Sequence, residues 1–168
     1  MKNLFWNCGQ RLLHKLAMVA PGGYSLRPQL HRCRGVKIDS KVWISQYVYI
    51  DEIHPESVSI GSNSSIGIRV SIIAHLYWGP RKEVNPTGSV CIEEDVFIGP
   101  HCVILPNVHI GKGSVIPAGT VVAKNVPAHT LWGTPKGRPM ARVEVPLTAE
   151  YSYEQFSEGL GPWSMNRK

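Results

Sequence analysis

A strict six-residue repeat runs from Val90 to Pro127 of this 168-residue chain. Divided into hexads from Ile92, the segment is IEEDVF, IGPHCV, ILPNVH, IGKGSV, IPAGTV and VAKNVP. The first position is aliphatic in every hexad, and its members are Ile92, Ile98, Ile104, Ile110, Ile116 and Val122. The fifth position is small or β-branched throughout, and its members are Val96, Cys102, Val108, Ser114, Thr120 and Val126. Neither the helical period nor the alternation of an ordinary strand produces a repeat of six. The pattern therefore predicts a parallel β-helix.

Each hexad of such a helix is one short strand followed by a corner, and three hexads make a triangular coil of about eighteen residues. Stacking the coils places the aliphatic first positions above one another in a dry central file. Burying each of these side chains contributes roughly 1.5–3 kcal/mol relative to leaving it exposed. Gly, Asn and Asp near the corners tolerate the positive φ that tight turns require. The alternative, a β-sandwich with coincidental spacing, is disfavoured by six consecutive aliphatic residues at one interval.

The same spacing begins earlier in the chain, at Ile38, and resumes at Ile60 after a four-residue insertion around residues 53–56. A longer break at residues 76–89 is rich in Gly and Pro, and the register is intact on both of its sides. Such a segment must leave the triangular section as a protruding loop. We therefore expect a β-helix domain over residues 36–127 that carries this loop.

Residues 1–35 precede the predicted β-helix. Apolar residues recur at helical spacing over residues 3–20, and a Pro-Gly-Gly sequence then ends the pattern, so we expect a helix there. Charged residues interrupt its apolar run, which argues against a secretory signal and a membrane span. The remainder is a basic linker in which Arg27, Arg32 and Arg34 are expected to face solvent. An alternative for the helix is weak association with a membrane surface, because basic residues accompany its apolar ones.

Residues 128–168 follow the repeat. They comprise a basic, turn-rich exit, a short helix expected around residues 148–158, and a tail from Gly159. The formal net charge of +6 favours an anionic ligand or surface. The four cysteines are scattered and form no CxxC pair, which argues against a zinc knuckle or a disulfide framework and favours a reducing cytoplasm.

One histidine stands where the repeat is interrupted. His75 lies immediately before the predicted loop, and loops held on a rigid scaffold are where catalytic groups concentrate. Its residue type suits proton transfer near neutral pH. His75 is therefore the first candidate for chemistry.

The segment IGPHCVILPNVHIGKGSVIPAGTVVAKNVPAHTLWGTP resembles the closing coils and exit of the hexapeptide-repeat acyltransferases. The likeness extends over about residues 35–143 and is greatest with the galactoside, maltose and polysaccharide O-acetyltransferase branch. It implies an all-β fold, a left-handed parallel β-helix, to which the residue pattern adds an N-terminal helix and a short C-terminal helix or tail. It also implies a homotrimer with active sites between subunits, acetyl-CoA as the acyl donor, a saccharide or other small-molecule acceptor, and neither a metal nor a nucleic-acid partner.

The resemblance assigns roles by position. His75, in SIIAHLYW, would be the general base that takes a proton from an acceptor hydroxyl as its oxygen attacks the thioester. The residues expected to contact acetyl-CoA are Pro100, Ala118, Ala123, Lys124, Arg138 and Arg142. The residues expected to contact the acceptor are Ser45, Tyr47, Asp51, Trp78 and Arg81.

The sequence departs from the family at the acceptor. No sugar-holding asparagine is evident in ISQYVYIDE, and Tyr47, Tyr49 and Trp78 could instead stack on a sugar ring or pack within the trimer. Asp51 and Glu52 are both candidates for orienting His75.

Three alternative functions remain open. N-acetyl transfer to an amino sugar or antibiotic would use the same histidine. A non-catalytic β-helix subunit should lack both that histidine and the basic exit. A γ-class carbonic anhydrase needs three zinc-binding histidines, and the intervals between His75, His101 and His109 do not match its pattern.

Overall fold

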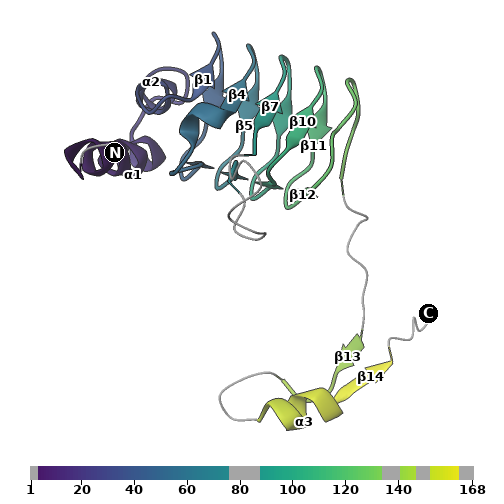
Figure 1. Ribbon diagram of the computed structural model, residues 1–168. Helices are drawn as coiled ribbons and strands as arrows, with labels where there is room; N and C mark the ends of the chain where they lie inside the picture. The colour runs from purple at the N-terminus through teal and green to yellow at the C-terminus, as the bar shows by residue number, and fades with distance from the viewer. Residues whose placement is uncertain (1–3, 76–87, 134–140, 147–151, 163–168) are drawn as a thin grey trace, which may run out of the picture. The chain divides into compact units, whose positions relative to one another are not determined.

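A computed structural model of the chain describes residues 4–75, 88–133, 141–146 and 152–162, with the side chains of residues 4–8 excepted. The chain divides into two compact units, Met1–Thr134 and Pro135–Lys168. The first unit consists of stacked triangular coils with two helices at their N-terminal end (Figure 1). No helix within the described residues is both long and apolar enough to span a membrane.

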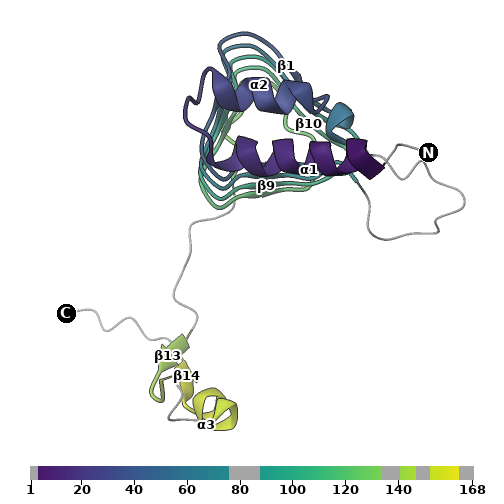
Figure 2. The same ribbon diagram turned by 90° about the vertical axis from the view of Figure 1, so that its left-hand side faces the viewer.

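Three parallel sheets form the sides of the triangular prism, and every coil contributes one short strand to each sheet (Figure 2). The first sheet contains β1 (Lys37–Ile38), β4 (Val58–Ile60), β7 (Val90–Ile92) and β10 (Val108–Ile110). The second contains β2 (Trp43–Ile44), β5 (Ser65–Ile66), β8 (Phe97–Ile98) and β11 (Val115–Ile116). The third contains β3 (Tyr49–Ile50), β6 (Ser71–Ile72), β9 (Val103–Ile104) and β12 (Val121–Val122). This is the predicted left-handed parallel β-helix.

The predicted aliphatic file is the core. All six first-position residues from Ile92 to Val122 are at most 1% exposed. The fifth positions are also buried, and their polar members are satisfied: Ser114 Oγ donates to the carbonyl of Pro127, and Thr120 Oγ1 donates to that of Pro117. The repeat thus specifies both what is buried and how the few buried hydroxyls are paired.

The stacking extends past Pro127, the residue at which the repeat was predicted to end. Val126 pairs in parallel with Ile110, and Leu131 pairs in parallel with Val115. Residues 76–87, which include most of the predicted protruding loop, lie outside the described part of the chain. On both sides of them the register is unbroken, since Ile60 on β4 is paired with Ile92 on β7.

The corners use positive φ more widely than expected. Asn63, Asp95 and Asn107 adopt it as predicted, and so do Gly113 and Gly119. Five other residues also have φ between 55° and 58°, and they are Lys41, Tyr47, Arg69, His101 and His129. The stacked corner geometry therefore overrides the local preference of the residue.

Two helices cover the N-terminal end of the prism, where one helix and a solvent-exposed linker were predicted. α1 (Leu4–Val19) and α2 (Leu26–Cys33) lie side by side across the triangular end (Figure 2). The prediction of a linker was wrong, since the structure has α2 there. The segment gave little sign of a helix because it is only 8 residues long, contains Pro28 and has a weak apolar pattern. Polar contacts, rather than apolar packing, hold this helix in place.

Those contacts arise because the first coil is an edge of the β-helix. Hydrogen bonds run in both directions between neighbouring coils, as from the amide of Asp39 to the carbonyl of Ile60 and from the amide of Asn63 back to the carbonyl of Ser40. The backbone groups of the first coil that point away from the second coil have no further coil to pair with, and unpaired buried carbonyls are costly.

Three arginines supply the missing donors, and we call Arg27, Arg32 and Arg34 the arginine cap. Arg27 Nε donates to the carbonyl of Ile44 on β2 at 2.7 Å, and Arg32 Nε donates to that of Ile38 on β1 at 2.9 Å. Arg34 donates from Nη1 and Nη2 to the carbonyl of Ile50 on β3, both at 3.1 Å. Each arginine covers one strand of the first coil, so the side chains predicted to be solvated close an otherwise open edge.

The C-terminal unit is small. α3 (Tyr153–Glu158) begins with a capping box at Ser152, and β13 (Ala141–Val143) pairs antiparallel with β14 (Leu160–Pro162). The predicted helix is present but shorter than expected, and part of the predicted tail is strand β14.

Adjacent residues of β12 test the core. Val122→Ala should lower the free energy of unfolding by about 2–3 kcal/mol because it removes methyl groups from a packed file. Val121→Ala, at a position that is 52% exposed, should change it by less than about 0.5 kcal/mol. Urea denaturation measures both, and equal losses would contradict the assigned inward and outward faces.

Two buried histidines of the helical end predict acid sensitivity. Burial, with the nearby charge of Arg34, lowers the pKa of His14 to about 4 and that of His31 to about 3. Both are neutral in the fold at neutral pH, whereas in the unfolded chain they take up protons near pH 6.5. As pH falls from about 6.5 toward 4, unfolding takes up as many as two extra protons, so the stability falls by about 1.4 kcal/mol per pH unit for each of them.

His31→Gln should remove about half of this pH dependence, as measured by urea denaturation at a series of pH values. The exposed His129 provides the control, and His129→Gln should leave the dependence unchanged. A His31→Gln variant with the slope of the wild type would contradict the prediction.

Candidate functional site

His75 and Asp51 meet at one corner of the prism. We call this line of turns, which follows the strands of the third sheet, the third corner; it comprises residues 51–57, 73–75, 105–107 and 123–125. Asp51 follows β3 in the first coil, and His75 ends the second coil shortly after β6. The parallel register of these two strands brings together residues that are 24 positions apart in the sequence.

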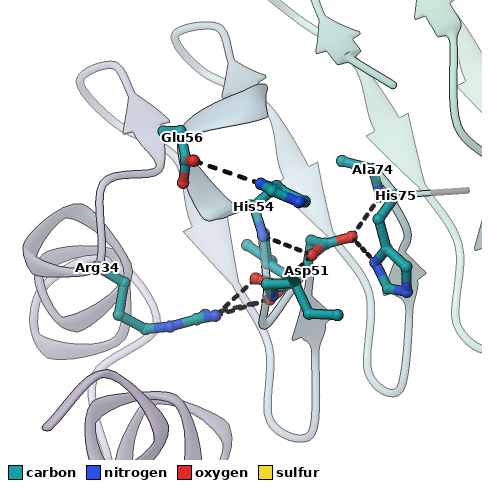
Figure 3. A network of polar contacts seen from close by, with 8 residues as sticks. Arg34, Asp51, His54, Glu56, Ala74 and His75 are labelled. Atoms are coloured by element: carbon teal, nitrogen blue, oxygen red, sulfur yellow. Dashed lines mark hydrogen bonds and ion pairs between the residues drawn. The ribbon is translucent and has the colours of Figure 1, made fainter. Parts of the chain in front are cut away.

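The carboxylate of Asp51 accepts four hydrogen bonds (Figure 3). Oδ1 accepts from the amides of Ile53 and His54, both at 2.9 Å. Oδ2 accepts from the amide of Ala74 at 2.7 Å and from His75 Nδ1 at 2.5 Å. All of its lone-pair directions are thereby used, and the carboxylate is held in one orientation.

The insertion after β3 makes this arrangement possible. The chain turns immediately after Asp51 and runs into the short helix η1 (Pro55–Ser57). This turn points the amides of Ile53 and His54 back at the side chain of Asp51, as aspartates often do in turns. An uninterrupted hexad would not supply these two donors.

The protonation states follow from these contacts. Burial would by itself raise the pKa of Asp51, but the hydrogen bonds from His54, Ala74, His75 and Ile53 outweigh it and hold that pKa below its usual value. The carboxylate is therefore ionised at neutral pH and can only accept hydrogen bonds. His75 Nδ1 must then carry the proton in the His75–Asp51 contact, which leaves the lone pair of the neutral ring on Nε2.

The His75–Asp51 pair is suited to act as a general base. The side chains of His75 and Asp51 are 6% and 0% exposed. A buried carboxylate that fixes the tautomer of a histidine also stabilises the imidazolium formed when Nε2 takes a proton. The chemistry open to the pair is proton abstraction from a bound hydroxyl or amine.

Asp51 thus has a place that differs from the predicted one. It was expected to contact the acceptor, but its carboxylate is buried and its bonding capacity is filled by the protein. It is instead the group that orients His75. Glu52, the other candidate for that role, forms an ion pair with Arg11 of α1 at 3.3 Å.

The residues expected to contact acetyl-CoA lie at two corners. Ala123 and Lys124 are exposed at the third corner, two coils beyond His75. Pro100 and Ala118 lie one above the other at the second corner, which comprises residues 45–47, 67–69, 99–101 and 117–119. Gly99 permits their close approach, because a Cβ there would lie 2.5 Å from the amide nitrogen of Ala118.

The remaining predicted residues are dispersed. Ser45 and Tyr47 belong to the second corner, in the first coil, where the Tyr47 ring lies 5.7 Å from the Arg69 guanidinium. Arg142 lies on β13 of the C-terminal unit, exposed and 4.0 Å from Glu144. Trp78, Arg81 and Arg138 lie outside the described residues.

Within the described residues of the first unit, the predicted site residues are therefore not brought together in one place. The second and third corners flank the strands of the third sheet, and they hold different parts of the predicted machinery. The histidines of the zinc alternative are also apart: His75 is at the third corner, His101 at the second, and His109 on the first sheet. No group of three or more His, Cys, Asp or Glu side chains in the described part of the chain is placed to hold a metal ion.

Comparisons with known proteins agree with the repeat and the fold. Residues 92–124 match the family described as bacterial transferase hexapeptide (six repeats). The chain is similar to the Bacillus subtilis protein YvoF, provisionally named an acetyltransferase, with 34% identity over 125 residues, or 74% of this chain and 65% of YvoF. It spans smaller shares of other curated relatives, among them serine acetyltransferases and N-acetyltransferases.

Solved structures share the architecture. A hexapeptide-repeat acetyltransferase from Vibrio cholerae, complexed with acetyl coenzyme A, superposes with a TM-score of 0.58 at 20% identity, covering 76% of this chain and 82% of that one. A maltose O-acetyltransferase from Clostridium difficile superposes with a TM-score of 0.52 at 21% identity, covering 71% and 76%. At these identities the likeness establishes the fold alone.

The Asp51 site predicts a loss of stability that an ordinary surface aspartate would not give. Asp51→Asn places an amide where four donors converge, so buried donors lose their acceptor, and the free energy of unfolding should fall by about 2–4 kcal/mol. Asp39 is the matched control, since it follows β1 as Asp51 follows β3 but is exposed. Asp39→Asn should change the free energy by less than about 0.5 kcal/mol in the same urea titration, and an equally mild Asp51→Asn would contradict the assignment.

Proposed function

Because the chain belongs to the hexapeptide-repeat acetyltransferase family, we propose that it transfers the acetyl group of acetyl-CoA to an acceptor hydroxyl, with His75 as the general base. The observation that carries this proposal is the His75–Asp51 pair, whose 2.5 Å contact fixes the proton on Nδ1 and leaves Nε2 to act as a base.

The proposed reaction has a simple proton balance. Nε2 of His75 takes the proton of the acceptor hydroxyl while its oxygen attacks the thioester carbonyl carbon. The tetrahedral intermediate collapses as the C–S bond breaks, and the imidazolium returns the proton to the departing CoA thiolate. The Asp51 carboxylate stabilises the imidazolium between these steps but does not itself take the proton. General-base assistance of this kind contributes about 10²–10⁴-fold.

We propose that the complete site forms between copies of the chain in a homotrimer. The division of the predicted groups between two corners supports this, because a neighbour could bring its second corner, with Pro100 and Ala118, to the His75 of another copy. The cationic Lys124, with Arg138 and Arg142, would meet the phosphates of the nucleotide. Trp78 and Arg81 would cover the site.

The proposed acceptor is a sugar hydroxyl, in a saccharide, nucleotide sugar or polysaccharide precursor. Tyr47 is 44% exposed and could stack on a sugar ring, which supports this choice. An amine acceptor could be deprotonated by the same base, so N-acetyl transfer is the second candidate. The exposed thiols of Cys33 and Cys91 support a proposed location in a reducing cytoplasm.

His75→Ala should reduce acetyl transfer by at least about 100-fold, because the substitution removes the group that accepts the proton. Release of the CoA thiol from acetyl-CoA, measured colorimetrically against a panel of sugars, nucleotide sugars and amines, gives the rate and identifies the acceptor class. His109→Gln is the control, since His109 is half-exposed on the first sheet and pairs with Glu93; its rate should stay within about twofold of the wild type. Undiminished turnover by His75→Ala would overturn the catalytic assignment, and no thiol release with any acceptor would favour a non-catalytic role.

A further inference from the structure

Arg34 is the member of the arginine cap that reaches the candidate site. Its side chain is buried, with a relative exposure of 3%, and it donates from Nη2 to the carbonyl of Asp51 at 2.6 Å in addition to its two bonds with Ile50. His31 Nδ1 accepts a bond from Arg34 Nη1 at 3.1 Å, because a guanidinium can only donate. The guanidinium is therefore fixed on one side by His31 of α2 and on the other by the end of β3, and Figure 3 shows the second of these contacts.

Asp51 is the point at which two sets of contacts meet. Arg34 holds its main-chain carbonyl, and its carboxylate holds Nδ1 of His75. Fixing the carbonyls of Ile50 and Asp51 fixes the peptide plane between these residues and limits the rotation of the next one. The direction in which the Asp51 side chain leaves the backbone is thereby set from the helical end of the molecule.

We propose that Arg34 is a positioning residue for the Asp51–His75 pair: it holds the backbone of Asp51 so that the carboxylate meets His75 Nδ1 and keeps the base in the Nδ1–H tautomer. The role rests on the proposed function only for its catalytic consequence. The geometric claim concerns the histidine itself and can be measured without substrate.

A built-in control separates positioning from simple support of the fold. Arg32 donates from Nε to Ile38 at 2.9 Å and from Nη2 to Asp39 at 2.7 Å. It therefore grips an Ile-Asp pair at the end of β1 just as Arg34 grips the Ile-Asp pair at the end of β3. Asp39 is exposed, however, and lies at another corner, away from His75. Loss of Arg32 removes the same kind of capping contact without touching the candidate site.

The experiment compares Arg34→Gln, Arg34→Lys and Arg32→Gln with the wild type. The first readout is the ¹⁵N chemical shifts of the His75 ring in histidine-labelled protein, with the His75 signals identified by their loss in His75→Gln. The wild type should show a protonated Nδ1 and an unprotonated Nε2. Arg34→Gln should move both shifts toward the average of the two tautomers, whereas Arg32→Gln should leave them in place.

The second readout is steady-state acetyl transfer. Arg34→Gln should lower kcat about 10- to 100-fold while KM for acetyl-CoA stays within about twofold, since a displaced base slows the chemical step and leaves donor binding intact. Arg34→Lys keeps one charged donor and should recover part of the loss. Arg32→Gln should keep a kcat within about twofold of the wild type even if it unfolds at a lower urea concentration.

The outcomes are distinguishable. Wild-type shifts in Arg34→Gln, or equal changes in Arg34→Gln and Arg32→Gln, would overturn the positioning role. If Arg34→Gln fails to fold, Arg34→Lys carries the same comparison. A wild type that shows no His75-dependent transfer would overturn the proposed function, and the ring shifts would still decide whether Arg34 positions His75.

Discussion

The first coil of this β-helix is an open edge of all three sheets, and the N-terminal part of the molecule is arranged to close it. The outward backbone groups of this coil face no further coil. The amide of Ile44 donates to the carbonyl of Gly23, and the outward carbonyls, among them that of Ile44, accept from arginine side chains. Guanidinium groups suit these sites because a planar fork can serve two adjacent carbonyls at once, as Arg34 does. The arginine cap thus takes the place that a further strand would have at this edge. It is supplied by a helix that has little apolar surface of its own.

The pairing between coils also explains where the candidate base can be built. Within uninterrupted hexads, the backbone groups are used between coils, and the inward side chains are apolar or carry a small hydroxyl, as Ser114 and Thr120 do. A buried carboxylate needs free amides, and these are available only where the repeat is broken. The insertion after β3 frees the amides of Ile53 and His54, and the end of β6 provides that of Ala74. Asp51 can therefore be both buried and ionised, which the repeat itself would not permit.

The sequence predicted the core that repeats from hexad to hexad, but it did not predict the polar contacts that lie outside the repeat. The file from Ile92 to Val122 was identifiable because each residue repeats the environment of the one a hexad earlier, so that a register alone specifies the core. The burial of Arg27 and Arg34 could not be predicted from the sequence. Their partners are main-chain carbonyls, which no residue type identifies, and these carbonyls meet α2 only after the first coil has folded. Asp51 is an intermediate case. The sequence offered it together with Glu52 as a candidate partner of His75, but the choice between them required the geometry of the third corner.

The two corners raise a constraint on assembly that does not depend on naming an acceptor. A parallel β-helix keeps each side chain on its own side of the prism through every coil, so groups at the second and third corners of one chain cannot converge by local rearrangement. They can meet only if two copies pack with different corners facing each other. Such a contact is heterologous, and a closed ring is the way for a heterologous contact to satisfy every copy without forming an open filament. In the proposed enzyme, the convergence of these groups around His75 and the closure of a cyclic oligomer would therefore be one geometric demand.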